Sequence, residues 1–350
     1  MVIISCIVTK KGNMAIKILR NDKLWIEDNA IKQLNEFSKY DDVVDVIGLP
    51  DLHVGFTPVG VTFKTKDLVY PFFIGNDIGC GMSLIDTNMK LKKFDKEKVY
   101  KKLEDTSIYG EYSIGGGNHF AEFQSVHKIF NKELFKSLGL DRNHLYLLVH
   151  SGSRGVGDSI YRRFASDKGL DKNSEECKEY MQLHNDAIKY ALHNRLGIAD
   201  VLCKYLSIKN NNQLIVDCMH NGIVEYEGYI YHHKGSVSTL NEYAIIAGSR
   251  GTCSYLVKCI RNEELLYSIS HGAGRKWPRH LCKGRLMSKY SKDEIKTSKL
   301  GSLVITNKKE LLYEEASEAY KDIDNVIEVL VCEGVIEVIA SFIPLLTYKS

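Results

Sequence analysis

The chain has 350 residues, of which 44% are hydrophobic and 26% are charged, so it can bury a large core at an ordinary globular composition. Its formal charge of +3 is too small to mark a nucleic-acid-binding protein by itself. No segment approaches the roughly 18 uncharged apolar residues of a membrane span, and residues 1–6 lack the basic region of a secretory signal.

The nine cysteines are an odd number, and no pair has the C-x-x-C spacing of a structural zinc site or a redox motif. Several of them lie in apolar stretches, which indicates a reducing compartment. Together with the absence of a signal or a membrane span, this predicts a cytoplasmic protein.

Apolar residues recur at three- and four-residue steps near residues 94–104, 173–195 and 314–333, which predicts helices there. Elsewhere short apolar runs end in glycine and predict buried strands. These runs are Val43–Leu49, Val69–Ile74, Leu145–Val149, Leu214–Cys218, Tyr243–Ala247 and Leu265–Ile269. We see no linker, internal repeat or low-complexity segment, so residues 1–350 are expected to form one domain.

Polar residues of catalytic types follow each apolar run. Six strand ends that converge on one site would make a single large α/β or α+β domain with a deep cleft. The segments that follow the runs are Pro50–His53, Gly75–Gly81, His150–Gly155, His220-Asn221, Gly248–Gly251 and Ser270–Arg275.

Asp77 and Cys80 stand three residues apart in a glycine-rich turn, where both side chains can face one metal ion. A thiolate with imidazoles favours zinc or another transition metal over magnesium, and added carboxylate and phosphate oxygens broaden the choice to manganese. Taken alone, the pair also fits an inert buried thiol beside a turn aspartate.

Three further loops carry candidate ligands. His119 follows the glycine-rich stretch Gly115–Asn118 and precedes Glu122, so backbone N–H groups there could cradle a phosphate, although a glycine triplet is more often a plain turn. His150 starts a loop with hydroxyl and guanidinium groups. Of the three His-Asn pairs, His220-Asn221 follows a strand and is the better ligand candidate, whereas His184 and His193 lie in a helical stretch and are expected on the surface or in packing.

The segment Ser270–Arg275 has a histidine bordered by small residues, which leaves room for a bulky adduct on His271. The N–H groups of Gly272, Ala273 and Gly274 can hold a phosphoryl group, and Arg275 can offset its charge. Histidine is a competent nucleophile when one ring nitrogen is free and the other is fixed. Since one Asp, one Cys and three strand-end histidines match the demand of a two-metal centre, His271 is left as the nucleophile.

Along almost its whole length the chain resembles the RtcB RNA-splicing ligases. The matching motifs occur in the family's order, and so many ordered matches are hard to explain by chance. They are Pro50–His53, Gly75–Gly81, Gly117–Phe120, His150–Gly155, His220-Asn221, Gly248–Gly251, His271–Arg275, Ala319–Asp322 and Pro344–Lys349.

The resemblance implies a fold peculiar to the family, two Mn²⁺ ions and a histidine-linked GMP taken from GTP. His271 is similar to the guanylylated residue, and Asp51 to an acidic residue that assists guanylylation or the RNA steps. The implied metal ligands are Asp77, Cys80 as a bridge, His119, His150 and His220. Asn118, Gly272, Ala273 and Gly274 would touch phosphate, while Glu122, Ser249, Ser254, Tyr320 and Lys349 would hold or stack on guanine.

The sequence departs from the family pattern in three places. Pro278 precedes Arg279 where the motif normally continues as Ser-Arg, Arg250 stands where Met is common, and the stretch Val54–Thr57 is trimmed. The compact form resembles a subset linked to a release-factor homologue and to repair of ribosomal RNA.

The resemblance therefore implies an enzyme that joins RNA 3′-phosphate or 2′,3′-cyclic-phosphate ends to 5′-hydroxyl ends. Its substrate would be broken tRNA or rRNA, with a release-factor homologue or an archease as partner and a monomer as the expected state. A two-metal phosphohydrolase is the alternative, but it has no reason for Tyr320 and Lys349. A catalytically inactive RNA-binding relative is a third possibility. The presence of every residue matched to catalysis argues against it.

The basic runs at 90–93 and 276–280 could line a phosphate path, and only the second adjoins a motif.

Overall fold

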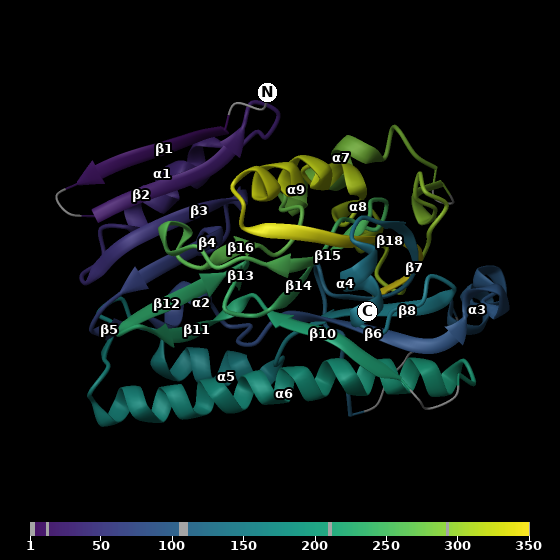
Figure 1. Ribbon diagram of the computed structural model, residues 1–350, viewed down its shortest axis with the longest axis horizontal. Helices are drawn as coiled ribbons and strands as arrows, with labels where there is room; N and C mark the ends of the chain where they lie inside the picture. Colours follow the sequence, from purple (N-terminus) through teal and green to yellow (C-terminus); the bar gives the residue numbers. More distant parts are fainter. Residues whose placement is uncertain (1–3, 12–13, 105–110, 209–211, 292–293, 350) are drawn as a thin grey trace.

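The computed structural model describes residues 4–11, 14–104, 111–208, 212–291 and 294–349. Residues 1–3 of the N-terminal stretch considered above and Ser350 therefore lie outside the described part. Within it, strands and helices form the mixed α+β fold that the sequence predicts (Figure 1).

The larger of two main β-sheets has eight strands in the order β10-β6-β8-β7-β18-β15-β14, with β17 joined to β18. Neighbours along this path are antiparallel, and β17 pairs with β18 in parallel. The strands are β6 (Gly81–Lys90), β7 (Phe120–Ile129), β8 (His144–Ser151), β10 (Gln213–Met219), β14 (Tyr243–Ile246), β15 (Ser254–Cys259), β17 (Leu303–Thr306) and β18 (Ile336–Lys349).

A smaller sheet of six strands lies beside it in the order β1-β2-β3-β4-β12-β11, and two strand pairs, β13-β16 and β5-β9, stand apart. The six strands are β1 (Ile4–Lys11), β2 (Met14–Asn21), β3 (Val43–His53), β4 (Val59–Thr65), β11 (Asn221–Tyr226) and β12 (Tyr229–Lys234). The pairs are β5 (Leu68–Val69) with β9 (Leu170–Asp171), and β13 (Ser236–Ser238) with β16 (Ser268–Ser270).

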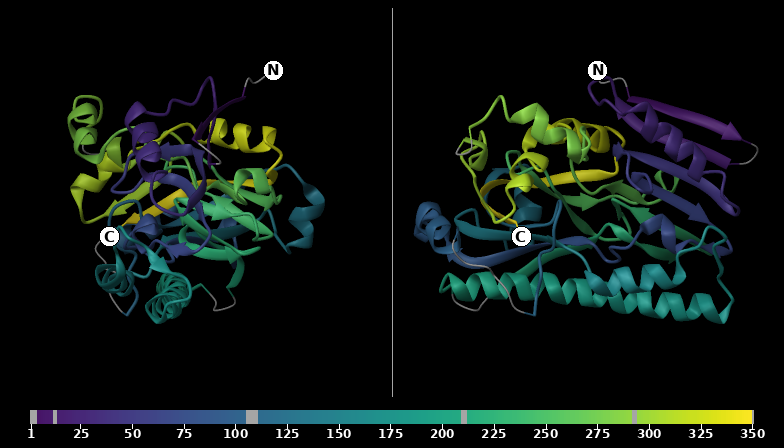
Figure 2. Two further views of the ribbon diagram at one scale, coloured as in Figure 1. Left: turned by 90° about the vertical axis from the view of Figure 1, so that its left-hand side faces the viewer. Right: turned by 180° about the vertical axis from the view of Figure 1, so that it is seen from behind.

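The helices surround these sheets, and the longest, α6, runs the length of the molecule beneath the larger sheet (Figure 2). No helix in the described ranges is long and apolar enough to cross a membrane. The α-helices are α1 (Asp28–Phe37), α2 (Pro71–Ile74), α3 (Lys96–Glu104), α4 (Lys132–Ser137), α5 (Gly155–Phe164), α6 (Glu175–Tyr205), α7 (Arg279–Leu286), α8 (Lys309–Glu314) and α9 (Ile323–Cys332). Short 3₁₀ turns are η1 (Leu91–Lys93), η2 (Glu263–Leu265), η3 (Glu294–Lys296) and η4 (Ser317–Ala319).

Both faces of the larger sheet are buried, which explains why its strands read as continuous apolar runs. In β8, Leu147 packs toward α6, while Leu148 on the opposite face belongs to the core shared with β3 and α9. The sheet is thus sandwiched between α6 on one side and the smaller sheet with α9 on the other.

Most predicted elements are confirmed, and two are wrong. The run Val69–Ile74 is a strand for its first residue only, because Pro71 fixes the backbone angle that starts a helix and α2 follows. The predicted helix at 314–333 is broken into the end of α8, η4 and α9. The predicted strand Leu265–Ile269 starts later, as β16, and the helix predicted near 173–195 extends to Tyr205.

The antiparallel register brings the polar strand ends together at one end of the larger sheet. Antiparallel neighbours alternate in direction, so the start of one strand meets the end of the next. Gly81 at the start of β6 pairs with Ser151 at the end of β8 and with Met219 at the end of β10, Phe120 pairs with His150, and Ala121 pairs with Tyr348.

Arg195 of α6 is fully buried beneath these strand ends. Its guanidinium forms a two-pronged ion pair with Asp217 of β10, with both distances 2.9 Å. Its Nη1 also donates to the carbonyls of Gly79 and Ser151, each at 2.9 Å. One side chain therefore ties the turn before Cys80, the end of β8 after His150 and the strand before His220.

Removing a large side chain from the sheet core should destabilise the protein. Phe342 of β18 is 0% exposed and its ring centre lies 5.1 Å from that of Tyr146. We expect Phe342→Ala to lower the free energy of unfolding by about 3–5 kcal/mol, measured by denaturant titration. Phe130→Ala, at a position 46% exposed, should change it by less than about 1 kcal/mol. Similar losses for the two variants would contradict this account of the core.

Neutralising Arg195 should cost more than neutralising a surface arginine. In Arg195→Gln, the Asp217 carboxylate and two buried carbonyls lose their donor, so we expect a loss of about 3 kcal/mol in the free energy of unfolding. The exposed pair of Arg163 with Glu179 offers a matched control, and Arg163→Gln should change stability by about 0.5 kcal/mol or less. An Arg195→Gln protein as stable as the parent would refute the linking role.

Candidate metal centre and nucleotide pocket

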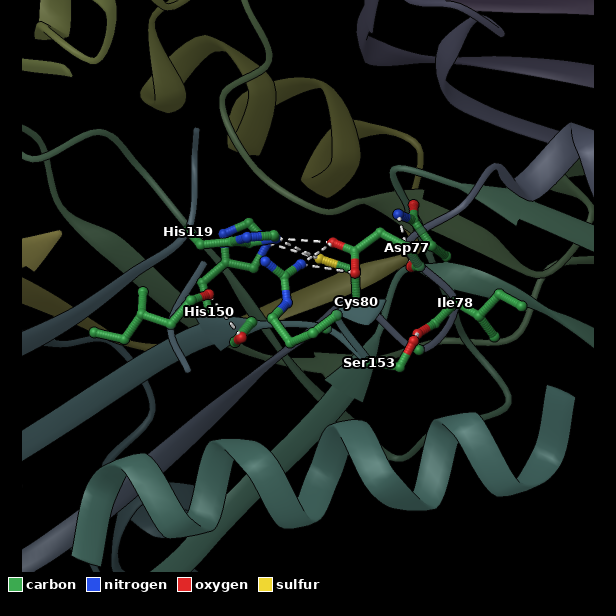
Figure 3. A network of polar contacts seen from close by, with 12 residues as sticks. Asp77, Ile78, Cys80, His119, His150 and Ser153 are labelled. Carbon is green, nitrogen blue, oxygen red and sulfur yellow. Dashed lines mark hydrogen bonds and ion pairs between the residues drawn. The ribbon is translucent and has the colours of Figure 1, made fainter. Parts of the chain in front are cut away.

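Cys80, His119 and His150 converge at the end of the larger sheet, with their ligand atoms all within 4.8 Å of one another. The Cys80 Sγ lies 3.2 Å from Nε2 of His119 and 3.3 Å from Nε2 of His150. Cys80 comes from the turn before β6, His119 from the residue before β7, and His150 from β8 itself. The three side chains point toward one another in Figure 3.

The other two predicted ligands adjoin this group. His220 Nε2 lies 3.2 Å from His150 Nε2, and Asp77 Oδ2 lies 3.0 Å from His119 Nε2. Both Asp77 oxygens also accept from Nη2 of Arg154 at 2.8 Å. Burial alone would raise the pKa of Asp77, but His119 and Arg154 hold it well below its usual range.

The protonation states suit a cation at this place. Burial lowers the pKa of His150 and His220 well below the usual value, so both imidazoles are neutral and can offer a lone pair. Burial also raises the pKa of the Cys80 thiol, and a coordinated metal would reverse that shift by deprotonating it. Buried sulfur and imidazole donors beside a half-buried carboxylate fit a transition metal.

His271 lies next to this centre and is oriented by Asp51. Its Nδ1 lies 2.7 Å from Oδ2 of Asp51, which is 0% exposed, and its ring centre lies 4.7 Å from that of His220. Lys321 holds the backbone on both sides of Asp51, because its buried Nζ donates to the carbonyls of Pro50 at 3.1 Å and Leu52 at 2.6 Å.

The chain around His271 requires glycine at one position. Gly274 has a φ of 67°, and a Cβ there would lie 2.4 Å from the carbonyl oxygen of Asp51. The neighbouring Ala273 N–H donates to the Ala247 carbonyl at 3.0 Å, so this predicted phosphate donor is already used within the protein.

A cavity of about 340 Å³ connects the candidate metal centre with His271 and with Lys349 at the end of β18. Nearly all predicted site residues line it. Asp51 and Ser254 do not, since Asp51 lies behind His271 and Ser254 lies behind the wall, where its hydroxyl accepts from Gln124 at 3.3 Å. The predicted residues in the lining are Asp77, Cys80, Asn118, His119, Glu122, His150, His220, Ser249, His271, Gly272, Ala273, Gly274, Arg275, Tyr320 and Lys349.

Glu315 is the central anion at the far end of this cavity. Arg275 Nη1 lies 3.1 Å from it, Arg279 3.3 Å and Lys349 3.8 Å, and the Tyr320 hydroxyl donates to it. Burial alone would raise the pKa of Glu315, but the three cations lower it to about 2. Arg275, predicted to offset phosphate charge, is thus engaged with Glu315 and Tyr320.

Glu122 and Lys349 face the same cavity. Glu122 accepts hydrogen bonds from Gln124 Nε2 and Thr347 Oγ1, yet burial still raises its pKa to about 7. Lys349 is buried and donates to the His119 carbonyl at 3.0 Å, and burial lowers its pKa to about 8. Lys349, the last residue of β18, is therefore fixed inside the cavity.

Arg250, one of the departures from the family pattern, lines the cavity and also forms a cross-link within the protein. Its Nη2 donates to the carbonyls of Ile295 at 3.0 Å and Leu312 at 2.8 Å. A guanidinium can thus tie η3 and α8 to the loop that carries Ser249, which a methionine could not do.

Sequence reasoning missed Arg195, Glu315 and Lys321 as residues that organise the site. Arg195 stands in a helical stretch beside a His-Asn pair interpreted as surface or packing, and Glu315 in a predicted helix. Lys321 lies within the matched segment Ala319–Asp322, which was the one available signal for it.

Comparison with known proteins identifies the family of this chain. A model of the family "tRNA-splicing ligase RtcB" matches residues 33–112 and 110–350. The chain is 40% identical to "RNA-splicing ligase RtcB2" of Escherichia coli, over 96% of each chain, and 25% identical to "tRNA-splicing ligase RtcB" of Nanoarchaeum equitans, over 97% of this chain and 96% of that protein. It is also 28% identical to "tRNA-splicing ligase RtcB" of Methanococcus maripaludis, over 75% of this chain and 64% of that protein. This chain therefore belongs to the RtcB family of RNA-splicing ligases.

Proposed function

We propose that the protein is a GTP- and Mn²⁺-dependent RNA ligase that carries GMP on His271. It would join a 3′-phosphate or 2′,3′-cyclic-phosphate end to a 5′-hydroxyl end. The observation that carries the proposal is the 2.7 Å contact between Asp51 and His271 Nδ1. It keeps the proton on Nδ1 and leaves the Nε2 lone pair free for attack.

The guanylylation step follows from this orientation. The Nε2 lone pair forms a bond to the α-phosphorus of GTP, the bond to the bridging oxygen breaks, and pyrophosphate leaves. The imidazole becomes positively charged, and the buried Asp51 carboxylate stabilises that charge at Nδ1. Lys321, which holds the flanking carbonyls, acts as a positioning residue for Asp51.

GMP would then pass from Nε2 to an RNA 3′-phosphate, which restores the histidine and forms an RNA-3′-pp-5′-G end. Attack by a 5′-hydroxyl on that activated phosphorus forms the phosphodiester bond and releases GMP. Asp77, Cys80, His119, His150 and His220 would hold the Mn²⁺ ions. When bound, the ions would neutralise charge on the phosphates.

Guanine is the base that the far end of the cavity favours. An ionised Glu122 can accept from the N–H groups of guanine, and the Lys349 ammonium can donate to its carbonyl oxygen, which adenine lacks. Tyr320 offers a ring on which a base can stack. These groups support the GTP-dependent ligase over a two-metal phosphohydrolase, which needs neither a nucleophilic histidine nor a base pocket.

The physiological RNA, tRNA or rRNA, and any archease or release-factor partner remain predictions from the family resemblance. The same holds for a monomeric state. A pull-down of tagged protein with sequencing of the bound RNA ends would identify the substrate.

Removing the nucleophile should abolish covalent guanylylation. With α-labelled GTP and Mn²⁺ we expect acid-labile label on the parent protein and none on His271→Ala, because no other group would form the phosphorus–nitrogen bond. Asp51→Asn should slow labelling by about 10²–10⁴-fold, since an amide no longer fixes the tautomer or stabilises the imidazolium. His127→Ala, at an exposed position on β7, should label like the parent. Label that persists in His271→Ala would remove the assignment.

Nucleotide binding should strengthen as the pH rises through 7. The pKa of Glu122 is raised by burial to about 7, so its carboxylate, the form that accepts from guanine, becomes populated between pH 6 and pH 8. We expect GTP affinity, measured by calorimetry, to rise about fivefold between pH 6 and pH 7 in the parent and to stay flat in Glu122→Gln, because Lys349, with a pKa of about 8, stays protonated over this range. An equal rise in both proteins would contradict the role of Glu122.

The raised pKa of Glu122 also predicts how the stability of the folded protein depends on pH. A carboxyl whose pKa is raised in the folded protein favours the protonated state, so its contribution is present below the ordinary value of 4.5 and is lost as the pH rises to about 7. The free energy of unfolding of Glu122→Gln should therefore increase relative to that of the parent as the pH rises from 4.5 to about 7.

A further inference from the structure

A strongly basic segment begins at the cavity and leads away from it over α7. Residues 276–289 contain Lys276, Arg279, His280, Lys283, Arg285 and Lys289 and no aspartate or glutamate. The whole chain is nearly balanced, with 47 Lys+Arg against 44 Asp+Glu, so this local excess is not a property of the composition. We call the outward-facing basic side chains of residues 280–289 the α7 basic surface.

The helix geometry turns these charges outward. Cys282 and Leu286 are buried one turn apart and attach α7 to the protein. His280, Lys283, Arg285 and Lys289 are exposed. The buried stripe leaves the rest of the short helix to solvent.

Arg279 connects this surface to the cavity. It lines the cavity, and its Nη1 would lie 2.9 Å from a Cβ placed on Gly117, in the loop before Asn118 and His119. Lys283 follows Arg279 by one helical turn, so the two side chains are neighbours on one side of α7. An eight-residue helix is about 12 Å long, which is enough to pass several phosphates of a strand that leaves the cavity.

Part of this positive charge is not neutralised by ion pairs among the described residues. Arg279 is paired with Glu315, and the Arg285 guanidinium lies over the Trp277 ring at 4.9 Å from its centroid. Within the described residues, His280, Lys283 and Lys289 have no ion pair. Exposed Leu281 and Met287 alternate with them and offer apolar contact to bases or sugars.

We propose that the α7 basic surface binds the phosphodiester backbone of a single RNA strand whose end enters the cavity beside Arg279. The inference rests on the proposed function for the nature of the ligand. It adds a binding site outside the metal centre and the guanylate pocket, with Lys283 and Lys289 as its phosphate contacts.

The test is the salt dependence of RNA binding. The probe is a fluorescently labelled single-stranded oligoribonucleotide with a 3′-phosphate, titrated by anisotropy at several KCl concentrations without GTP. For single strands the slope of log affinity against log salt is about −0.7 per neutralised phosphate. We expect the double variant Lys283→Gln, Lys289→Gln to bind more weakly and to reduce the magnitude of this slope by about 1.4.

A matched control removes two charges elsewhere. Lys92 and Lys93 are exposed on η1, beyond the far end of β6, and a ten-residue strand places them about 33 Å from the metal centre. The double variant Lys92→Gln, Lys93→Gln should keep the slope of the parent. A labelled dinucleotide, which is too short to extend from the cavity to Lys283 and Lys289, should bind the α7 variant and the parent equally.

The proposal is overturned if the α7 variant keeps the slope of the parent, or if the η1 variant loses as much. Thermal unfolding of each variant verifies that the fold is retained. Guanylylation of the parent is measured in parallel. Failure of the parent to take up label would contradict the proposed function while the salt slopes would still report on the α7 basic surface.

Discussion

The buried ion pair of Arg195 with Asp217 is the interaction on which the arrangement of the site depends. An arginine at the centre of a protein is costly to desolvate, and the cost is met here because its donors reach a carboxylate, a hydroxyl and two carbonyls. Those carbonyls belong to Gly79 and Ser151, the neighbours of Cys80 and His150. The planar guanidinium therefore holds the candidate metal ligands in one geometry, and α6 supplies the rigid support beneath them.

Burial then determines the protonation states of the groups that line the cavity. The same desolvation keeps His150 and His220 neutral, raises the pKa of Glu122 to about 7 and lowers that of Lys349 to about 8. Glu315 behaves oppositely because three cations surround it. Candidate metal ligands, the proposed guanine-binding groups and an oriented histidine thus share one desolvated cavity, where charges on a bound nucleotide would interact strongly with the protein.

Charged side chains play different roles in the interior and on the surface of the protein. Inside, charges are paired and held in place, as with Arg195 and Asp217, so that a small ligand meets one geometry. On α7, charges are exposed, which would suit a long flexible polyanion recognised by its backbone. Glu315 joins the two regions, because it pairs with Lys349 in the cavity and with Arg279 at the start of α7.

The sequence by itself determined the polar strand ends and the fold class, because sheets buried on both faces read as apolar runs and their ends as clusters of Asp, Cys and His. Its motifs also indicated the family, and nearly all of the site residues that they predicted line the cavity. Only the tertiary structure decided what Arg195, Glu315 and Lys321 do, since an isolated charge in a helical or loop segment has no periodic signal. It also decided that Ser254 lies behind the wall and that Asp51 meets His271 across 220 residues. Periodicity reports local burial, whereas the pairing of distant charges depends on how the sheets and helices pack.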